Sequence, residues 1–480
     1  QRKLEMSIKE QATKSVFWSA IERFSVQGIQ FILTIIIARI LSPDDYGLIA
    51  MLGIFLALSQ VLIDSGFAFA LVQKQKRTET DYNTAFYFNA FGSLFIYIIL
   101  YLLAPYIANF FEEPQLTIIT RVLGINLIIM SLGIVQQAKL TIALDFKHQA
   151  MASLIAVIIS GGIGLWMAYS GYGVWTLVFQ SIANNFLRVC FLWVFSRWLP
   201  CWKFSYQSFS SLFRFGSRLM LTGLLHELYS NLYSLIIGKF FSASDLGYYN
   251  RSYTLAQFPS ANIANVIVRA VYPIQCRYQD DMEQLRSMFM KYMRISCYVI
   301  FPFMVTLFVL AEPFVLILLT EKWLPAVSFI KILSLAFVWD PIMKINNNIL
   351  SVKGRTDYAL KAEVIKKVVA VILLVVSVPF GVTIMCFSLV LYAVADMVII
   401  IYFSRKVINI GYCVQFGGLL PVVFLNIVMG VVMYGITCFP LSVFAKLLIP
   451  LVVGWSLYLF LSWLFKMQEW SIFLSLIRRK

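Results

Sequence analysis

Long apolar stretches separated by short polar ones organise this chain. About fourteen segments have the roughly 20 mostly apolar residues that a helix needs to cross a membrane. No stretch between them is long enough to form a separate soluble domain. These segments are residues 15–41, 48–71, 85–104, 118–138, 149–169, 174–196, 217–240, 256–276, 288–310, 327–350, 364–380, 382–404, 417–438 and 443–465. The pattern predicts an all-α, polytopic membrane protein with about fourteen transmembrane helices.

The composition supports this prediction. Of the 480 residues, 60% are hydrophobic and 13% are charged. A typical soluble domain is about half apolar and about a quarter charged. We therefore expect an integral membrane protein.

The net charge of +16 is unevenly distributed along the chain. If both termini are cytoplasmic, most Lys and Arg residues fall in cytoplasmic segments, and the outer loops also carry acids. The basic residues of the outer loops are only Arg39, Lys239, Arg251, Lys322 and Lys446. This asymmetry follows the positive-inside rule. It predicts a multi-pass protein of the inner membrane with both termini in the cytoplasm, and it removes the reason to expect a nucleic-acid partner.

Two pairs of similar segments indicate an internal repeat. "IIARILSPDDYGL" begins at Ile36, and "IIGKFFSASDLGY" begins 200 residues later at Ile236. "ITRVLGINLI" similarly resembles "FIKILSLAFV", which places Arg121 opposite Lys331. Because six spans bring the chain back to its starting side, the two copies are parallel. Transporters commonly bind substrate between such halves.

The repeat predicts three parts of the chain. They are a six-helix lobe at residues 1–200, a second six-helix lobe at 201–410, and two additional helices with a cytoplasmic tail at 411–480.

Polar residues form stripes along several predicted spans. Arg23, Gln27 and Gln30 follow one another at spacings of four and three in the first span. Such spacings place side chains on one face of a helix. Asn262, Asn265, Arg269 and Tyr272 form a similar stripe in the eighth span. Other polar residues line the second, sixth, seventh, tenth and twelfth spans, namely Gln60, Asp64, Gln180, Asn184, Arg188, His226, Glu227, Asn231, Lys331, Asp340, Lys344, Ser388, Tyr392 and Asp396.

A charged side chain in hydrocarbon costs about 2.5–3.5 kcal/mol on insertion scales. We therefore expect these stripes to face one another or water. The candidate substrate-binding residues are Arg23, Gln27, Gln30, Arg121, Arg188, Asn262, Asn265, Arg269 and Lys331.

Simpler roles are open for several of these residues. Arg23 and Arg188 are near enough to the inner ends of their spans for snorkelling to relieve part of their depth. Arg121 and Lys331 lie near outer ends and could serve as anchors there. Asp340 and Lys344 have the spacing of an ion pair along one helix.

Four segments resemble the Wzx-type polysaccharide transporter family, which belongs to the multidrug/oligosaccharidyl-lipid/polysaccharide exporter superfamily. They are "WSA" at Trp18–Ala20, "ARILSPDDYGLIAM" from Ala38, "LGYYNRSYTL" from Leu246 and "VKGRTDYAL" from Val352. The resemblance covers nearly the whole chain. It implies a two-lobed flippase that moves a polyprenyl-diphosphate-linked oligosaccharide across the inner membrane for O-antigen, capsule or exopolysaccharide biosynthesis.

The residue chemistry agrees with this implied function. Each unpaired polar group in hydrocarbon costs several kcal/mol, so a glycan needs a wet or polar path. Arginine suits a diphosphate because its guanidinium pairs two oxygens at once. Carried over by helix and stripe, the cavity arginines of the family correspond best to Arg23 and Arg269. The partners expected are the lipid-linked glycan, membrane lipids and a glycan polymerase.

Other functions stay open. A multidrug exporter of the same superfamily would need an acidic cavity that accepts cations, and a lipid II flippase would carry a related substrate. A membrane glycan polymerase would need an acid or base poised at an outer loop, and the outer loops show no paired carboxylates with histidine. No Gly-rich phosphate loop or metal-ligand spacing points to an enzyme or a cofactor.

The energy source has one candidate site. Glu227, Asn231 and Asp396 offer carboxylate and amide oxygens, which suit a coupling Na⁺ or H⁺ in the second lobe. Hydrogen bonding between helices is an equally open role for these three residues.

The topology can be tested by thiol labelling in a background without the seven natural cysteines. Cysteines placed at Asp44, Glu113 and Glu321 should react with an impermeant reagent in intact cells, because these positions lie in outer loops. Cysteines at Lys76, Lys203 and Arg355 should react only after the membrane is opened. Labelling of this second group in intact cells would contradict the fourteen-span topology.

Overall fold

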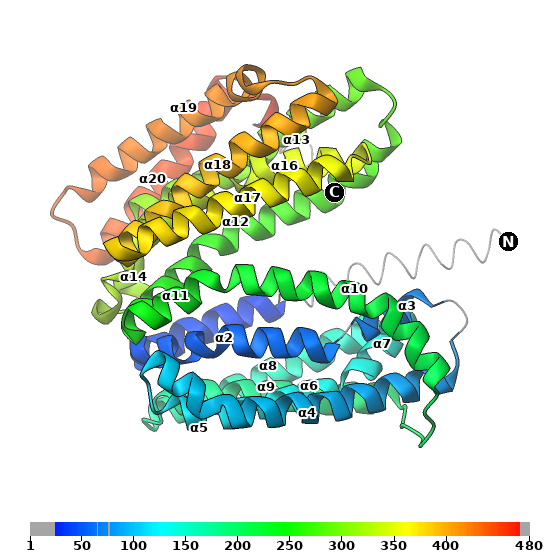
Figure 1. Cartoon of the computed structure of the whole chain (residues 1–480). Helices are drawn as coiled ribbons and strands as arrows, with labels where there is room; N and C mark the ends of the chain where they lie inside the picture. Colours follow the sequence, from blue (N-terminus) through cyan, green and yellow to red (C-terminus); the bar gives the residue numbers. More distant parts are fainter. Residues whose placement is uncertain (1–24, 65, 75–76, 471–480) are drawn as a thin grey trace. The chain divides into compact units, whose positions relative to one another are not determined.

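The computed structural model describes residues 25–64, 66–74 and 77–470. Within these ranges the chain forms α-helices and two short 3₁₀ turns, and no strand occurs in the part described (Figure 1). The chain divides into two compact units, Gln1–Gly247 and Tyr248–Lys480. Each unit is described by itself.

The first unit is a bundle of helices of very different lengths. It contains an apolar helix Ser25–Ile40 and the start of α12. Its labelled helices are α2 (Pro43–Asp64), α3 (Phe67–Gln73), α4 (Glu79–Phe111), α5 (Leu116–Leu123), α6 (Ile125–Ser131), α7 (Ile134–Ile142), α8 (Phe146–Tyr169), α9 (Val174–Ser196), α10 (Tyr206–Ser230) and α11 (Leu232–Phe240).

The second unit contains most of α12 and the remaining helices. In Figure 1 α17 and α18 run next to each other, as do α19 and α20. The elements are α12 (Ala243–Arg277), α13 (Met282–Val309), α14 (Ala311–Leu318), a 3₁₀ turn (Glu321–Trp323), α15 (Ala326–Phe337), α16 (Asp340–Val352), α17 (Thr356–Ser377), a second 3₁₀ turn (Val378–Phe380), α18 (Val382–Ile408), α19 (Tyr412–Thr437) and α20 (Val443–Leu464).

The helices confirm the predicted all-α, multi-pass membrane fold. Ten stretches in the described residues are long and apolar enough to cross a membrane. α10, α12 and α17 are not among the ten although they are long, because they carry many polar and charged residues. The predicted total of fourteen spans stays a prediction.

Several predicted spans are divided into separate helices, among them the second, fourth, seventh and tenth. The second is divided at Gly66, whose φ of 69° lies in the left-handed region that favours glycine. A Cβ at this position would also lie 2.7 Å from the Cα of Gly216. The fourth span bends at Gly124 and Gly133, where α5, α6 and α7 meet.

The seventh predicted span lies in the first compact unit. Its helices α10 and α11 pack against α2, and α10 also packs against α3 and α4. The units therefore divide after Gly247, whereas the lobe boundary predicted from the repeat is at residue 200. The boundary at residue 200 separates the two copies of the repeat, and it need not coincide with the division into compact units. The two six-helix lobes with two added helices stay a prediction.

The repeated motif begins a helix in both of its copies. The Asp45 carboxylate accepts from the backbone N–H of Ser42 at 2.9 Å, and the Ser42 hydroxyl accepts from the Asp45 N–H at 3.2 Å. Ser242 and Asp245 make the same two contacts at 3.3 and 3.1 Å. Each copy is thus a capping box that satisfies the free N–H groups at a helix start. This role explains why the serine and the aspartate recur.

The motif glycines allow the two copies to pack directly on each other. A Cβ on Gly47 would lie 1.8 Å from the carbonyl oxygen of Ala243, and one on Gly247 would lie 2.1 Å from the carbonyl oxygen of Pro43. Backbone atoms occupy both positions, so neither contact can be relieved by a side-chain rotation. The repeat seen in the sequence is therefore also a reciprocal contact in the fold.

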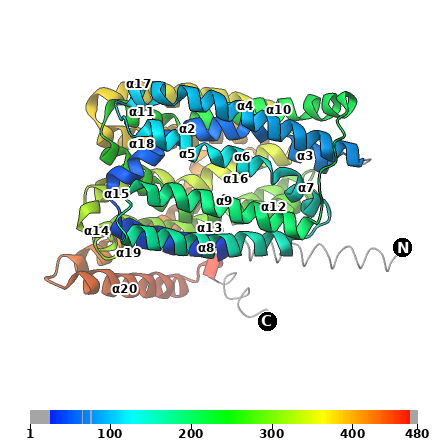
Figure 2. The same cartoon turned by 90° about the horizontal axis from the view of Figure 1, so that it is seen from below.

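Small residues bring α8 and α9 together within the first unit (Figure 2). Ala152, Ala156, Ser160 and Gly164 recur every four residues of α8 and are all buried. Small residues on one face let helix backbones approach closely in a membrane protein, where lipid supplies no hydrophobic drive for packing. This contact holds α9 in place.

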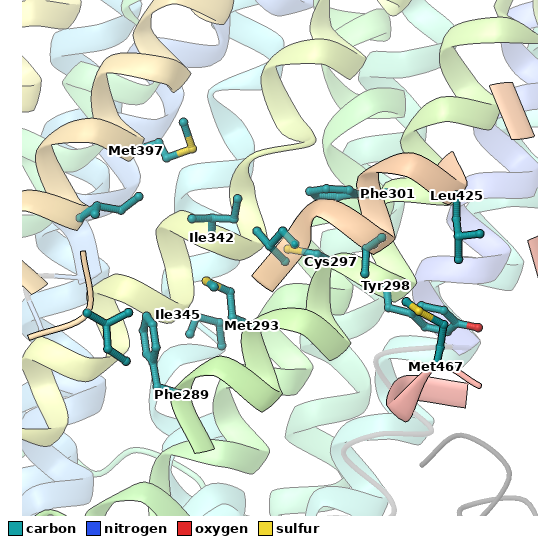
Figure 3. Packing of buried hydrophobic residues seen from close by; sticks show 14 of the residues in the cluster. Phe289, Met293, Cys297, Tyr298, Phe301, Ile342, Ile345, Met397, Leu425 and Met467 are labelled. Atoms are coloured by element: carbon teal, nitrogen blue, oxygen red, sulfur yellow. The ribbon is translucent and has the colours of Figure 1, made fainter. Parts of the chain in front are cut away.

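The core of the second unit forms around α13. Phe289, Met293 and Cys297 recur every four residues and are fully buried. Figure 3 shows them facing Ile342 and Ile345 of α16. The same cluster includes residues of α18 and α19, so these helices are fixed relative to one another.

We predict that Gly47→Ala and Gly247→Ala each destabilise the protein. An added methyl group must push backbone apart at either position, and overpacking typically costs about 1–3 kcal/mol. The apparent melting temperature of the purified protein in detergent measures the effect. Gly435→Ala is the matched control, since a Cβ there meets nothing within 4 Å. Equal melting temperatures for all three variants would contradict the reciprocal contact.

Candidate functional site

A cavity of about 270 Å³ in the first unit is lined by both apolar and polar residues. Its walls come from α2, α3, α6, α7 and α9. The polar residues of the lining are Gln60, Asp64, Gln137, Thr141, Asn185 and Arg188. Asp64, the last residue of α2, is in the lining, so the cavity lies toward the predicted cytoplasmic side.

Arg188 is the basic residue of this lining. Its Nη2 donates a hydrogen bond to the Oε1 of Gln137 at 3.3 Å. Asp64 lines the same cavity and supplies a negative charge. The buried Oε1 of Gln60 accepts no hydrogen bond from the described residues. The cavity therefore offers a guanidinium, a carboxylate and amide groups to a polar ligand.

A second cavity of about 330 Å³ adjoins the first, and its mostly apolar lining includes a few polar residues. Gln60, Met130 and Asn185 border both cavities. The Nδ2 of Asn185 donates to Asn126 Oδ1 at 3.0 Å, and Asn126 Nδ2 donates to Ser181 Oγ at 3.2 Å. Amide and hydroxyl groups thus continue from one cavity to the next.

The structure divides the polar stripe that the sequence suggested for the sixth span. The Oδ1 of Asn184 accepts from Ser160 of α8 at 3.4 Å, and Gln180 packs against Gly164 of the same helix. Arg188 instead shares the cavity face with Ser181 and Asn185. Four residues turn a helix by about 400°, so a stripe of spacing four drifts by about 40° at each step. Arg188 therefore lines the cavity, while Gln180 and Asn184 hold α9 to α8. The predicted contact of Arg188 with a substrate stays a prediction.

Gln137 and Asn185 were absent from the candidate residues taken from the sequence. The signal for Gln137 was present, because Gln137 and Thr141 lie one turn apart on α7. The predicted span ended at residue 138 and so split the pair. For Asn185, the spacing of four in the sixth span indicated its neighbour Asn184 instead.

The first predicted stripe is only partly covered by the described residues. Arg23, like Glu22 beside it, lies outside them. Gln27 is half-buried and Gln30 is exposed on the helix Ser25–Ile40. Neither is among the residues that line the two cavities. Their predicted contact with substrate stays a prediction.

Arg121 has an anchoring geometry. Its guanidinium lies 4.2 Å from the centre of the Tyr101 ring, and its Nε donates to the Tyr101 carbonyl at 3.4 Å. Such a cation–π contact holds an arginine against an aromatic residue. Lys331, its counterpart in the repeat, is half-buried on α15. The structure places neither of them in the two cavities described above.

The stripe on α12 is held by its own helix and by α16. Asn262 donates to the Phe258 carbonyl one turn earlier at 2.9 Å. Asn265 Oδ1 accepts from Lys344 Nζ at 3.1 Å. Arg269 is exposed. Its predicted role at a substrate stays a prediction.

The three residues of the predicted ion site fall in both units. Asn231 Nδ2 donates to the Glu227 carboxylate at 3.2 Å within the first unit. Asp396 belongs to the second unit, where its Oδ1 lies 2.7 Å from Lys366 Nζ. Among the described residues, no group of three or more His, Cys, Asp or Glu side chains gathers as a metal site. The shared ion site stays a prediction.

Comparisons with known proteins agree with the resemblance in the sequence. Residues 36–328 match the model of a family described as polysaccharide biosynthesis protein. The teichuronic acid biosynthesis protein TuaB of Bacillus subtilis is 24% identical over 74% of each chain. The lipopolysaccharide biosynthesis protein WzxC of Escherichia coli is 25% identical over 75% of this chain and 74% of its own.

Solved structures share the fold. Lipid II flippase MurJ in an inward closed conformation has a TM-score of 0.77 and 14% identity, and the match covers 94% of this chain and 98% of MurJ. A multidrug resistance MATE family transporter of the MOP superfamily, in an inward-facing conformation, has a TM-score of 0.59 over 81% of this chain and 98% of its own. The family match spans more than half of the sequence. The chain therefore belongs to the polysaccharide biosynthesis protein family and is one of the Wzx-type transporters.

Proposed function

We propose that this protein is a flippase for a polyprenyl-diphosphate-linked oligosaccharide used in surface polysaccharide biosynthesis. The observation that carries the proposal is Arg188 in the cavity lining of a chain that belongs to a polysaccharide biosynthesis family. The names of TuaB and WzxC, together with the fold shared with MurJ, support the same conclusion.

The cavity chemistry fits the polar end of such a substrate. The Arg188 guanidinium can donate two parallel hydrogen bonds to phosphate oxygens. The amides of Gln60, Gln137 and Asn185 can replace water around sugar hydroxyls, since each offers both donors and an acceptor. A lipid tail can stay in the bilayer while the polar head moves. Alternating access would expose this surface first to one side of the membrane and then to the other.

The cationic character of the path would come from several arginines. Arg23 and Arg269 were predicted from one stripe in each copy of the repeat, and we propose that they bind the diphosphate at other stages of transport. Asp64 makes the first-unit cavity less basic than these arginines suggest. We propose that it limits how tightly the phosphates are held, so that the substrate can leave.

The cellular setting follows from the charge asymmetry and the relatives. We propose a bacterial inner membrane location with both termini cytoplasmic, and a glycan polymerase as the partner that receives the carried unit. The protein would act by transport and carry out no bond-making step. If an ion drives it, we propose that Na⁺ or H⁺ meets the Glu227 carboxylate, to which the Nδ2 of Asn231 donates a hydrogen bond at 3.2 Å.

Arg188→Ala should lower the rate of glycan-lipid flipping by about 10- to 100-fold. This factor corresponds to about 1.5–3 kcal/mol for a hydrogen bond to a charged group. Arg188→Lys should be partly active, because it keeps the charge and loses the paired donors. The measurement is flipping of a fluorescent polyprenyl-diphosphate glycan in proteoliposomes that contain equal amounts of each variant.

Arg214→Ala is the matched control for this experiment. It removes the same charge from the same unit at an exposed residue of α10 that lines neither cavity. Flipping should stay near that of the unmodified protein. Normal flipping by Arg188→Ala would show that the cavity arginine does not bind the substrate. Flipping of lipid II or of cationic dyes in place of the glycan would assign one of the alternative functions.

Glu227→Gln should weaken the response of flipping to the Na⁺ and H⁺ gradients while protein abundance stays near normal. The substitution removes the charge that would attract a cation and keeps the side-chain shape. Flipping rates with each gradient imposed in turn check this outcome. A full gradient response in Glu227→Gln would show that the driving ion binds elsewhere.

A further inference from the structure

A group of six charged residues links three helices of the second unit. It consists of Asp340, Lys344, Glu363, Lys366, Lys367 and Asp396. Asp340 and Lys344 are on α16, Asp396 is on α18, and the remaining three are on α17. The group contains three acids and three bases, so its formal charge sums to zero without an added ion.

The contact between α17 and α18 is the most buried part of this group. Lys366 Nζ lies 2.7 Å from Asp396 Oδ1, and the two side chains are only 8% and 15% exposed. Glu363 lies on the more exposed side, 3.9 Å from Lys366 and 3.1 Å from Lys367. Lys366 is thus paired with Asp396. The neighbouring pair of Glu363 and Lys367 is more exposed.

The α16 part of the group is held by α12. Ser260 Oγ donates to Asp340 Oδ2 at 2.9 Å, while Lys344 Nζ donates to the Ala261 carbonyl and to Asn265. Lys344 is also one turn after Asp340 on α16. Each part of the group thus places a lysine near a carboxylate, and the contact of Lys366 with Asp396 is an ion pair.

The depth of Asp396 makes such a pairing necessary. Asp396 is twelve residues before the end of α18 at Ile408, which is about 18 Å at 1.5 Å per residue. A carboxylate so far from the helix end needs a cation or a proton, because burying an unpaired charge is costly. Carboxylate oxygens also suit a hard cation such as Na⁺. Lys366 and an external cation would compete for the same oxygen.

We infer that Lys366 is a tethered counter-cation that occupies the position at Asp396 where a free Na⁺ would bind. The ammonium group neutralises Asp396 in every ionic condition, so ion binding by the unmodified protein does not run through this carboxylate. Removing the ammonium group should open a cation site that the protein does not otherwise have. The inference concerns ion binding alone and goes beyond the proposed movement of a glycan.

The test is Na⁺-specific stabilisation of the purified full-length protein. Melting temperatures are compared in sodium chloride and in choline chloride at equal concentration, because choline is too large for a carboxylate site between helices. Lys366→Gln should gain a Na⁺-specific rise of about 2 °C over the unmodified protein, as expected for a ligand that binds only the folded state. The introduced amide can add an oxygen ligand for the ion.

Two further variants make the result specific. Lys366→Arg keeps the charge, so its response to Na⁺ should equal that of the unmodified protein. The double variant Lys366→Gln/Asp396→Asn removes the carboxylate and should lose the added response. Any Na⁺ response that arises at Glu227 is common to all of these proteins and cancels in the comparison.

Two outcomes would overturn the inference. One is a folded Lys366→Gln protein that gains no Na⁺-specific rise. The other is a Na⁺ response in the unmodified protein that the double variant lacks, since this would mean that Na⁺ already reaches Asp396. If Lys366→Gln fails to fold, the unmodified protein is compared with the double variant alone. Equal Na⁺ responses of these two proteins support the inference. The readout uses no glycan, so failure here leaves the proposed flippase function untouched.

Discussion

Hydrocarbon offers no hydrogen bonds, and this constraint decides where the polar residues of this protein lie. Every polar group within a span must find a protein partner or line a cavity. The two units meet the constraint differently. The second unit pairs its buried charges, with Lys366 on Asp396 and with Asp340 and Lys344 each held by α12. The first unit places Asp64 and Arg188 in the lining of a cavity.

This difference has a functional reason in a transporter. A cavity that binds a polar head group must keep donors and acceptors within reach of the ligand, whereas a scaffold must leave none unpaired. The buried cluster of Asn346, Gln415 and Ser404 shows the second case, because these side chains hydrogen-bond one another across α16, α19 and α18. Arg188 and Gln137 are an example of the binding case, because they hydrogen-bond each other and also line the first cavity.

The repeated motif starts two helices and lets them pack closely. Its serine and aspartate cap α2 and α12, and its glycines let the two copies meet at backbone distance. A capping box and a close helix contact each tolerate few residue types. The recurrence therefore reflects two equivalent helix starts packed on each other. The candidate binding residues lie outside this motif.

The sequence by itself determined the membrane class, the helical content, the repeat and the family. These depend on local patterns such as long apolar runs, capping residues and short motifs. It also placed Arg188 among the candidate binding residues, and contact of Arg188 with a substrate stays a prediction. The neighbour that each polar residue faces was decided only by tertiary structure. A stripe fixes directions around its own helix, but the rotation of that helix depends on packing, as between α8 and α9. A shift of one residue, about 100°, therefore separated Asn184 from Asn185. Lys366 likewise has no distinguishing pattern in the sequence at the start of the predicted span 364–380, and only the packing of α17 on α18 brought it to Asp396.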